Sequence, residues 1–158
     1  MKTFAPLLVL FLVAFAACNP KHEKSSDKHH HEYLKVDGYS PGLGDFMLKM
    51  QIRHSKLWFA GINENWELAD FQLHEMEELL EDIQKYKSDK DEVKLIPMIE
   101  APLESVDAAV DAKDLEGFKS AYKNLTVTCN NCHVASKHAV NVIKVPETPI
   151  FSNQEFKP

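Results

Sequence analysis

The residues of this chain that are best suited to cofactor or metal chemistry lie in one short stretch, TVTCNNCHVASKH, at residues 126–138. Cys129 and Cys132 are separated by two residues, and His133 follows directly. Thiols at this spacing occur in zinc sites, in redox-active dithiols and in the attachment sequence of c-type haem. The adjacent histidine and the predicted secondary structure around the motif distinguish these three kinds of site.

Haem attachment accounts for all three residues of the motif. On a helix, the two sulfur atoms lie about one turn apart on one side, where each thiol adds across a vinyl group of the porphyrin and forms a thioether. His133 then presents an imidazole nitrogen to the iron. At ordinary residue frequencies, the motif arises by chance in roughly one protein of this length in a thousand. We therefore expect one covalently bound haem c per chain.

The two other chemistries fit the sequence less well. A structural zinc site needs four closed ligands, and no second Cys or His pair follows Cys132 at the required spacing. A thioredoxin-like dithiol is expected at the start of a helix after a strand, where the helix dipole lowers the thiol pKa. Here the motif falls near the end of a predicted helix in a chain without strand patterns.

The start of the sequence predicts export. Residues 1–17 carry one early charge and an apolar run from Phe4 to Ala17, which is shorter than the roughly 18–20 residues of a spanning helix. The sequence FAAC is similar to a bacterial lipoprotein signal, in which Cys18 becomes the lipidated first residue and anchors the chain to the membrane. The alternative is cleavage after Ala16, with Cys18 left as an unpaired thiol. Lipidation also accounts for the odd third cysteine.

Composition limits the partners. The net charge of −6 makes the chain a poor binder of nucleic acid, whose phosphates would repel it. We expect redox partner proteins on the periplasmic side of the membrane. Residues 18–42 are polar and contain Pro and Gly, which predicts a flexible tether. The tract His29 to His31 in this tether is either a weak transition-metal site or part of a solvated linker.

Residues 43–138 predict an all-α domain. Apolar side chains recur at spacings of three and four from Leu43 to about Gly61 and again from Trp66 to Ile83. A third helix is expected from about Asp89 to Ala112, kinked or broken at Pro97 and Pro102, and a fourth is expected after an N-cap at Asp114. Four helices with short connections predict an up-down-up-down four-helix bundle.

The predicted bundle with CNNCH on its last helix resembles the cytochrome c-prime type of class II c-type cytochromes. The resemblance covers roughly residues 43–138, is specific at the motif and is loose elsewhere. It implies that Cys129 and Cys132 hold the haem and that His133 is the proximal iron ligand. It also makes a homodimer possible, because proteins of this class often pair through their first two helices.

The residue on the other side of the iron follows from the expected register. In an up-down bundle, the start of the first helix lies level with the end of the fourth, and His133 lies about five residues before an end near His138. The level partner is then Met47, about five residues into the first helix. Met50 and His54 are the alternatives on the same face, together with an open or apolar site. His54 lies about 10 Å further along than Met47.

The remaining predictions concern the tail and the function. Residues 139–158 contain Pro146 and Pro149 but are too apolar for a free end, so we expect an extended tail lying across the haem edge or the bundle. His133/Met47 ligation is similar to that of the soluble b-type cytochrome bundle and implies a single-electron carrier rather than an enzyme. The alternatives are a five-coordinate protein that binds nitric oxide or carbon monoxide, and a structural lipoprotein without haem.

Overall fold

The computed structural model describes residues 41–158, which form an all-α domain and a C-terminal extended segment. Its helices are α1 (Leu43–Ile62), α2 (Trp66–Tyr86), the short 3₁₀-helix η1 (Asp91–Leu95), α3 (Pro97–Asp111) and α4 (Leu115–Ala135). The described residues contain no strand. None of the described helices combines the length and apolar character that crossing a bilayer requires.

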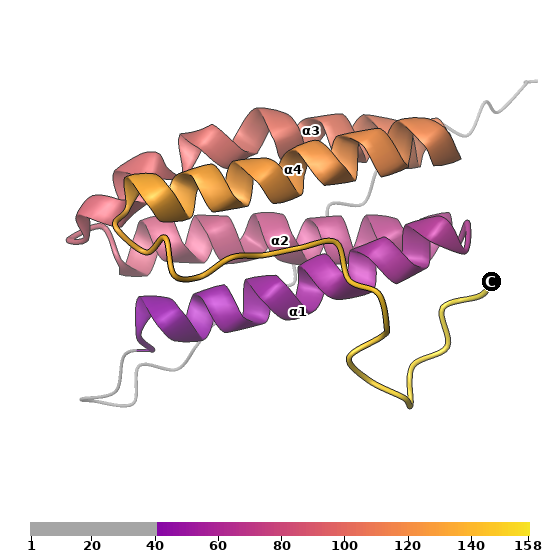
Figure 1. Cartoon of the computed structure of the whole chain (residues 1–158), viewed down its shortest axis with the longest axis horizontal. Coiled ribbons are helices and arrows are strands. Elements are labelled where there is room, and N and C mark those ends of the chain that lie inside the picture. The colour runs from indigo at the N-terminus through magenta and orange to yellow at the C-terminus, as the bar shows by residue number, and fades with distance from the viewer. Residues whose placement is uncertain (1–40) are drawn as a thin grey trace, which may run out of the picture. The chain divides into compact units, whose positions relative to one another are not determined.

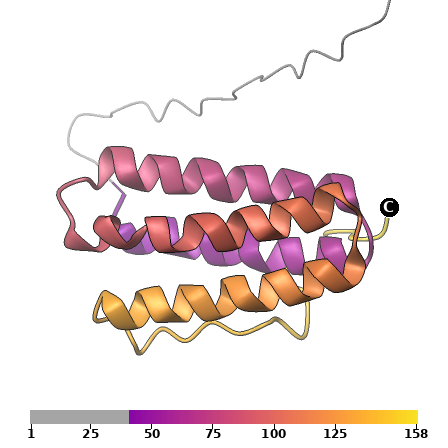
Figure 2. The same cartoon turned by 90° about the horizontal axis from the view of Figure 1, so that it is seen from above.

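The four long helices run up and down in chain order, which confirms the predicted four-helix bundle (Figure 1). The most extensive packing joins α1 to α2 and α3 to α4, whereas α1 and α4 meet over a smaller area. The two pairs lie one above the other in Figure 1, and Figure 2 shows the same bundle from above. The looser seam between α1 and α4 is where the tail and the motif residues meet.

Polar caps set the starts of the helices. The Asn65 side chain accepts a hydrogen bond from the Leu68 N–H at 3.2 Å, and the Asp114 carboxylate accepts one from the Gly117 N–H at 3.0 Å. These bonds satisfy backbone donors that have no partner within the helix. The predicted N-cap at Asp114 is confirmed.

The segment before α3 is interrupted once rather than twice. Pro97 occupies the first position of α3, where a missing N–H costs nothing, and the residues before it form η1. Pro102 lies inside α3, and the helix continues through it to Asp111. The predicted break at Pro97 is confirmed, whereas a break at Pro102 is wrong.

The fourth helix ends at Ala135, not near His138 as the register argument assumed. The His138 N–H bonds to the His133 carbonyl at 2.7 Å, and the Lys137 N–H bonds to the Val134 carbonyl at 3.1 Å. With Lys137 at a φ of 65°, these two bonds form a Schellman motif that terminates the helix. The reversal turns the chain back along α4.

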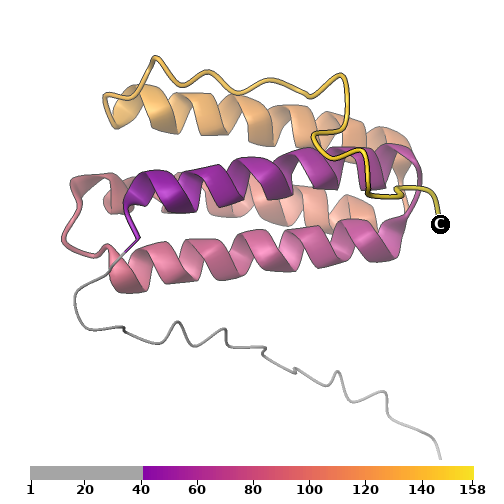
Figure 3. The same ribbon diagram turned by 90° about the horizontal axis from the view of Figure 1, so that it is seen from below.

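Residues 139–158 then run as an extended segment along the outside of the bundle, over the seam between α4 and α1 (Figures 1 and 3). Phe156 is buried near the end of this segment, and its ring packs on Phe59 with centroids 5.6 Å apart. The prediction of an extended tail lying against the bundle is confirmed.

The end of the bundle formed by the α1–α2 connection and the start of α4 is filled with aromatic rings, and we call it the packed end. Trp58, Phe118 and Tyr122 stack with centroids 4.9–6.1 Å apart, and Trp66 meets the Phe118 ring edge-on. A Cβ atom added at Gly61 would lie 2.1 Å from the Phe118 ring, so glycine is what lets this ring approach α1. The opposite end, which we call the cavity end, is hollow.

Candidate functional site

A cavity of about 570 Å³ occupies the cavity end. Its walls come from the first turns of α1, the last turns of α2 and α4, the start of α3 and the tail. The volume lies within the range of about 300–1,000 Å³ found for small-molecule and cofactor sites. The apolar part of its lining includes Leu43, Met76, Leu80, Ile83, Val93, Ile96, Ile99 and Val142.

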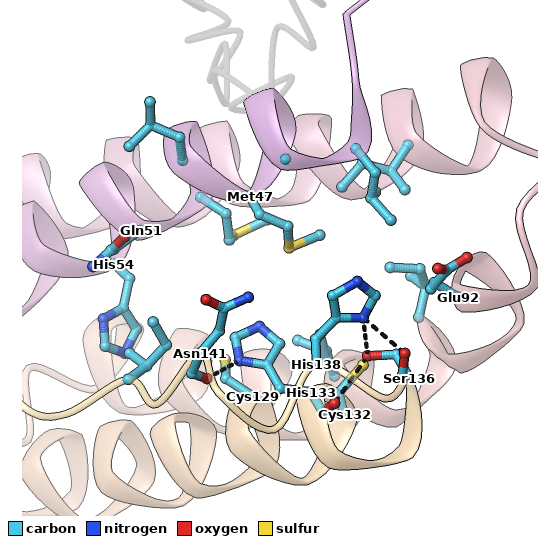
Figure 4. Close-up of a pocket in the computed structure, with 18 of the residues that line it drawn as sticks. Met47, Gln51, His54, Glu92, Cys129, Cys132, His133, Ser136, His138 and Asn141 are labelled. Atoms are coloured by element: carbon cyan, nitrogen blue, oxygen red, sulfur yellow. Dashed lines mark hydrogen bonds between the residues drawn. The ribbon is translucent and has the colours of Figure 1, made fainter.

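The cavity brings together every residue singled out from the sequence for haem binding in the described part of the chain. Cys129, Cys132 and His133 line it from α4, and Met47 lines it from α1 (Figure 4). The two alternatives for the distal position, Met50 and His54, border the same space.

The two thiols face an environment that opposes ionisation. Burial raises the pKa of Cys129 to about 11, with a smaller contribution from the nearby Cys132, and burial also raises the pKa of Cys132. Both cysteines are free. A redox dithiol of the thioredoxin type instead needs a lowered thiol pKa, so this surrounding does not favour that chemistry.

The His133 ring is oriented by the tail. Its Nδ1 lies 2.6 Å from the backbone carbonyl oxygen of Asn141, drawn as a dashed line in Figure 4. A carbonyl oxygen only accepts, so Nδ1 carries the ring proton and Nε2 keeps its lone pair. This is the arrangement by which metal-binding histidines are held in one tautomer.

His54 lies deeper and is already engaged. The Thr126 hydroxyl donates to the Tyr122 carbonyl at 2.9 Å and accepts from Nε2 of His54 at 3.0 Å. The Tyr122 hydroxyl lies 2.9 Å from Nδ1 of His54 and 2.8 Å from the His54 carbonyl oxygen. Burial lowers the pKa of His54 to about 4. With both ring nitrogens bonded, His54 belongs to a structural network rather than to a set of metal ligands.

A closed zinc site is not prearranged in the cavity. Within residues 41–158, the group of His, Cys, Asp or Glu side chains whose ligand atoms all lie within 4.8 Å of one another is Asp70, Asp107 and Asp111, between α2 and α3. The sulfur and nitrogen atoms of Cys129, Cys132 and His133 do not converge in this way, as tetrahedral coordination requires.

Several polar residues of the cavity were not predicted from the sequence. His138 projects into it from the turn after α4, with Nδ1 held 2.7 Å from the Ser136 carbonyl (Figure 4). Gln51 and Glu92 also line the walls. Gln51 lies on α1 at helical spacing from Met47 and His54, so the periodicity of this helix could have identified it. No local pattern marks His138 and Glu92, because the turn after α4 and η1 bring them to the cavity.

Two basic residues of α1 have partners away from the cavity. Arg53 pairs with Glu75 at 2.5 Å and lies over the Phe71 ring. Lys56 donates to the Gln154 side chain at 3.4 Å and lies over the Phe151 ring. Neither Arg53 nor Lys56 lines the cavity.

Several predictions fall on residues 1–40, outside the described part of the chain. These are the signal peptide at residues 1–17, lipidation at Cys18, the tether and the tract His29 to His31. They stay predictions.

Comparison of the chain with protein-family models, with curated proteins and with solved structures gave no significant match. The residues and geometry of the cavity end therefore carry the functional argument alone.

Proposed function

We propose that this chain is an exported monohaem c-type cytochrome that carries single electrons. Cys129 and Cys132 would hold the haem covalently, and His133 would bind the iron from the proximal side. The observation that carries this proposal is that all three side chains line one largely apolar cavity of about 570 Å³. The same proposal includes anchoring of this chain to the membrane through a lipid on Cys18 and exchange of electrons with redox partner proteins in the periplasm.

The residues fit the group in both shape and chemistry. Two thiols one helical turn apart supply the sulfur atoms for attachment, and the adjacent imidazole has its Nδ1 proton committed to the Asn141 carbonyl. The free Nε2 is then the ligand atom of His133. Bound haem supplies a one-electron Fe(III)/Fe(II) couple, which the protein tunes through ligands, hydrogen bonds and burial.

Met47 is the best candidate for the distal ligand. It is half-buried on α1 across the cavity from the motif (Figure 4), and its thioether has the softness that iron(II) accepts. His54 is engaged on both ring nitrogens, which supports Met47 over the imidazole alternative. Histidine and methionine ligation raises the reduction potential and suits a carrier.

Covalent attachment is the first point to test. The mature protein, made in a host that matures c-type haem, should show a Soret band that stays with the chain after denaturation and acid–acetone extraction. Cys129→Ser combined with Cys132→Ser should abolish it. Asn131→Ala, in the spacer of the motif, is the matched control and should keep it. Haem retained covalently by the double variant would contradict attachment through Cys129 and Cys132.

The distal ligand is tested by the visible spectrum with and without carbon monoxide. Sharp low-spin reduced bands that carbon monoxide does not change, and that become high-spin in Met47→Ala, would support His133/Met47 ligation. A high-spin wild-type spectrum that shifts with carbon monoxide would overturn the carrier function in favour of gas binding. A mature protein with no Soret band at all would favour the structural lipoprotein.

A further inference from the structure

One residue of the motif spacer holds the tail against α4. The Asn130 side-chain amide donates to the Ile143 carbonyl at 2.8 Å, and its oxygen accepts from the Ile143 N–H at 2.8 Å. Both hydrogen-bonding groups of the amide are thus used on the backbone of a single tail residue. The two bonds together fix the position and the direction of the tail at this point.

The clamp lies two residues from the carbonyl that orients His133. Asn141 is exposed, so no packing of its own side chain holds its backbone in place. Its carbonyl is instead fixed between a turn, in which the Asn141 N–H bonds to His138 at 2.9 Å, and the Asn130–Ile143 clamp. Two residues reach at most about 7 Å, so little freedom remains between clamp and carbonyl.

We propose that Asn130 is the positioning residue of His133 and thereby sets the reduction potential of the site. This inference rests on the proposed haem-binding function. By holding Ile143, Asn130 keeps the Asn141 carbonyl 2.6 Å from His133 Nδ1. A hydrogen bond from Nδ1–H increases the basicity of the ligating nitrogen, which stabilises the oxidised iron and lowers the potential. The tail acts on the iron through this chain of contacts.

The rest of the tail is anchored independently. Phe156 is buried against Phe59, and the Phe151 ring lies 5.1 Å from Nζ of Lys56. Loss of the Asn130 clamp should therefore release residues 141–143 without detaching the whole tail or unfolding the bundle. An effect on the potential can then be separated from a general loss of structure.

The experiment compares Asn130→Ala with Asn131→Ala in the haem-loaded mature protein. Asn131 is exposed and lies in the same spacer, which makes it the matched control. We expect Asn130→Ala to raise the reduction potential, with a change in the redox equilibrium of up to tenfold, which is 59 mV for a one-electron couple. Equal potentials in Asn130→Ala and Asn131→Ala would overturn the proposal.

Two further measurements do not depend on haem. In the full mature chain without haem, Asn130→Ala should speed the amide exchange of Ile143 and move the His133 ring away from the Nδ1–H tautomer, read from imidazole nitrogen chemical shifts. Unchanged exchange and an unchanged tautomer would refute the clamp even if haem never binds. Normal covalent haem with an unchanged potential would refute only this inference, whereas an absent Soret band in the wild type would refute the proposed function.

Discussion

The packed end and the cavity end of the bundle are built from the same four helices but filled in opposite ways. At the packed end, Trp58, Phe118 and Tyr122 stack on one another, and Gly61 leaves room for the Phe118 ring against α1. At the cavity end, the helices enclose about 570 Å³, and a Cβ atom added at Gly44 would meet nothing within 4 Å. The packed end is a filled core, whereas the cavity end has the volume of a binding site.

Comparing the two ends separates the residues that stabilise the fold from the residues that are available for function. Rigid rings interdigitate to native density and stabilise the bundle. The cavity end instead presents flexible methionines, two thiols and a histidine, which contribute little packing of their own. His54 lines the cavity and Tyr122 belongs to the packed end, so the His54–Tyr122–Thr126 network connects the two ends through hydrogen-bonded side chains.

Truncation of an aromatic ring at the packed end should have the largest effect. Phe118 is fully buried, so Phe118→Ala should lower the free energy of unfolding by about 3–5 kcal/mol, because it removes the ring and leaves a cavity. Leu43→Ala, at a half-buried residue bordering the existing cavity, should cost only about 1 kcal/mol. Urea unfolding followed by circular dichroism measures both. Similar losses for the two variants would show that the ends are equally packed in solution.

Acidification should destabilise the boundary between the two ends. The pKa of His54 is about 4 in the folded chain against 6.5 for an ordinary histidine, because burial disfavours the charged ring. Above pH 6.5 the ring is neutral in both states. As the pH falls from 6.5 to 4, the unfolded chain takes up a proton that the folded chain excludes, so stability should fall by about 3 kcal/mol.

The control for this pH dependence is a second histidine. His54→Gln removes the titrating group and should flatten the stability curve between pH 6.5 and 4. His74 is exposed, and its pKa is raised mainly by the hydrogen bond to the Asp70 carbonyl, so His74→Gln should not flatten the curve. A flat wild-type curve over this range would contradict the burial of a neutral His54.

The sequence predicts the bundle well because helical periodicity is local. The starts at Asn65 and Asp114 carry residues with strong capping preferences. The ends are harder to predict, because the residues with left-handed backbone after α1, α3 and α4 are Glu64, Lys113 and Lys137, where glycine is usual. For this reason α4 was predicted to run close to His138, three residues too far.

The candidate site also contains some residues that could be predicted from the sequence and others that could not. Cys129, Cys132 and His133 are recognisable because they are adjacent in sequence, and Met47 followed from counting turns in antiparallel helices. His138, Asn141 and the Asn130 clamp were not predicted, since their roles depend on a tail that reverses after α4 and has no periodicity. Long-range contacts of single backbone atoms leave no pattern in the sequence.

A third test of the difference in packing between the two ends is to add a methyl group at the packed end. Gly61→Ala would place a methyl group 2.1 Å from the Phe118 ring, inside van der Waals contact, so the ring or the helix must shift. We expect a loss of about 1–3 kcal/mol in the free energy of unfolding. Combining Gly61→Ala with Phe118→Leu should recover part of the loss, because the smaller side chain makes room for the methyl group. Additive losses in the double variant would contradict a direct clash.

The same substitution at the other end of the same helix should have the opposite sign. Gly44 lies in the first turn of α1, its backbone is not in the left-handed region, and an added Cβ meets no atom within 4 Å. Gly44→Ala should therefore raise the free energy of unfolding by about 0.5–1 kcal/mol, because alanine has less backbone freedom to lose on folding. The test is thermal unfolding of Gly44→Ala beside Gly61→Ala. A lower free energy of unfolding in Gly44→Ala would mean that other side chains contact the first turn of α1, so that this end of the bundle is not open. Stabilisation at Gly44 and destabilisation at Gly61 would instead establish that one helix is tightly packed at its end and open at its start.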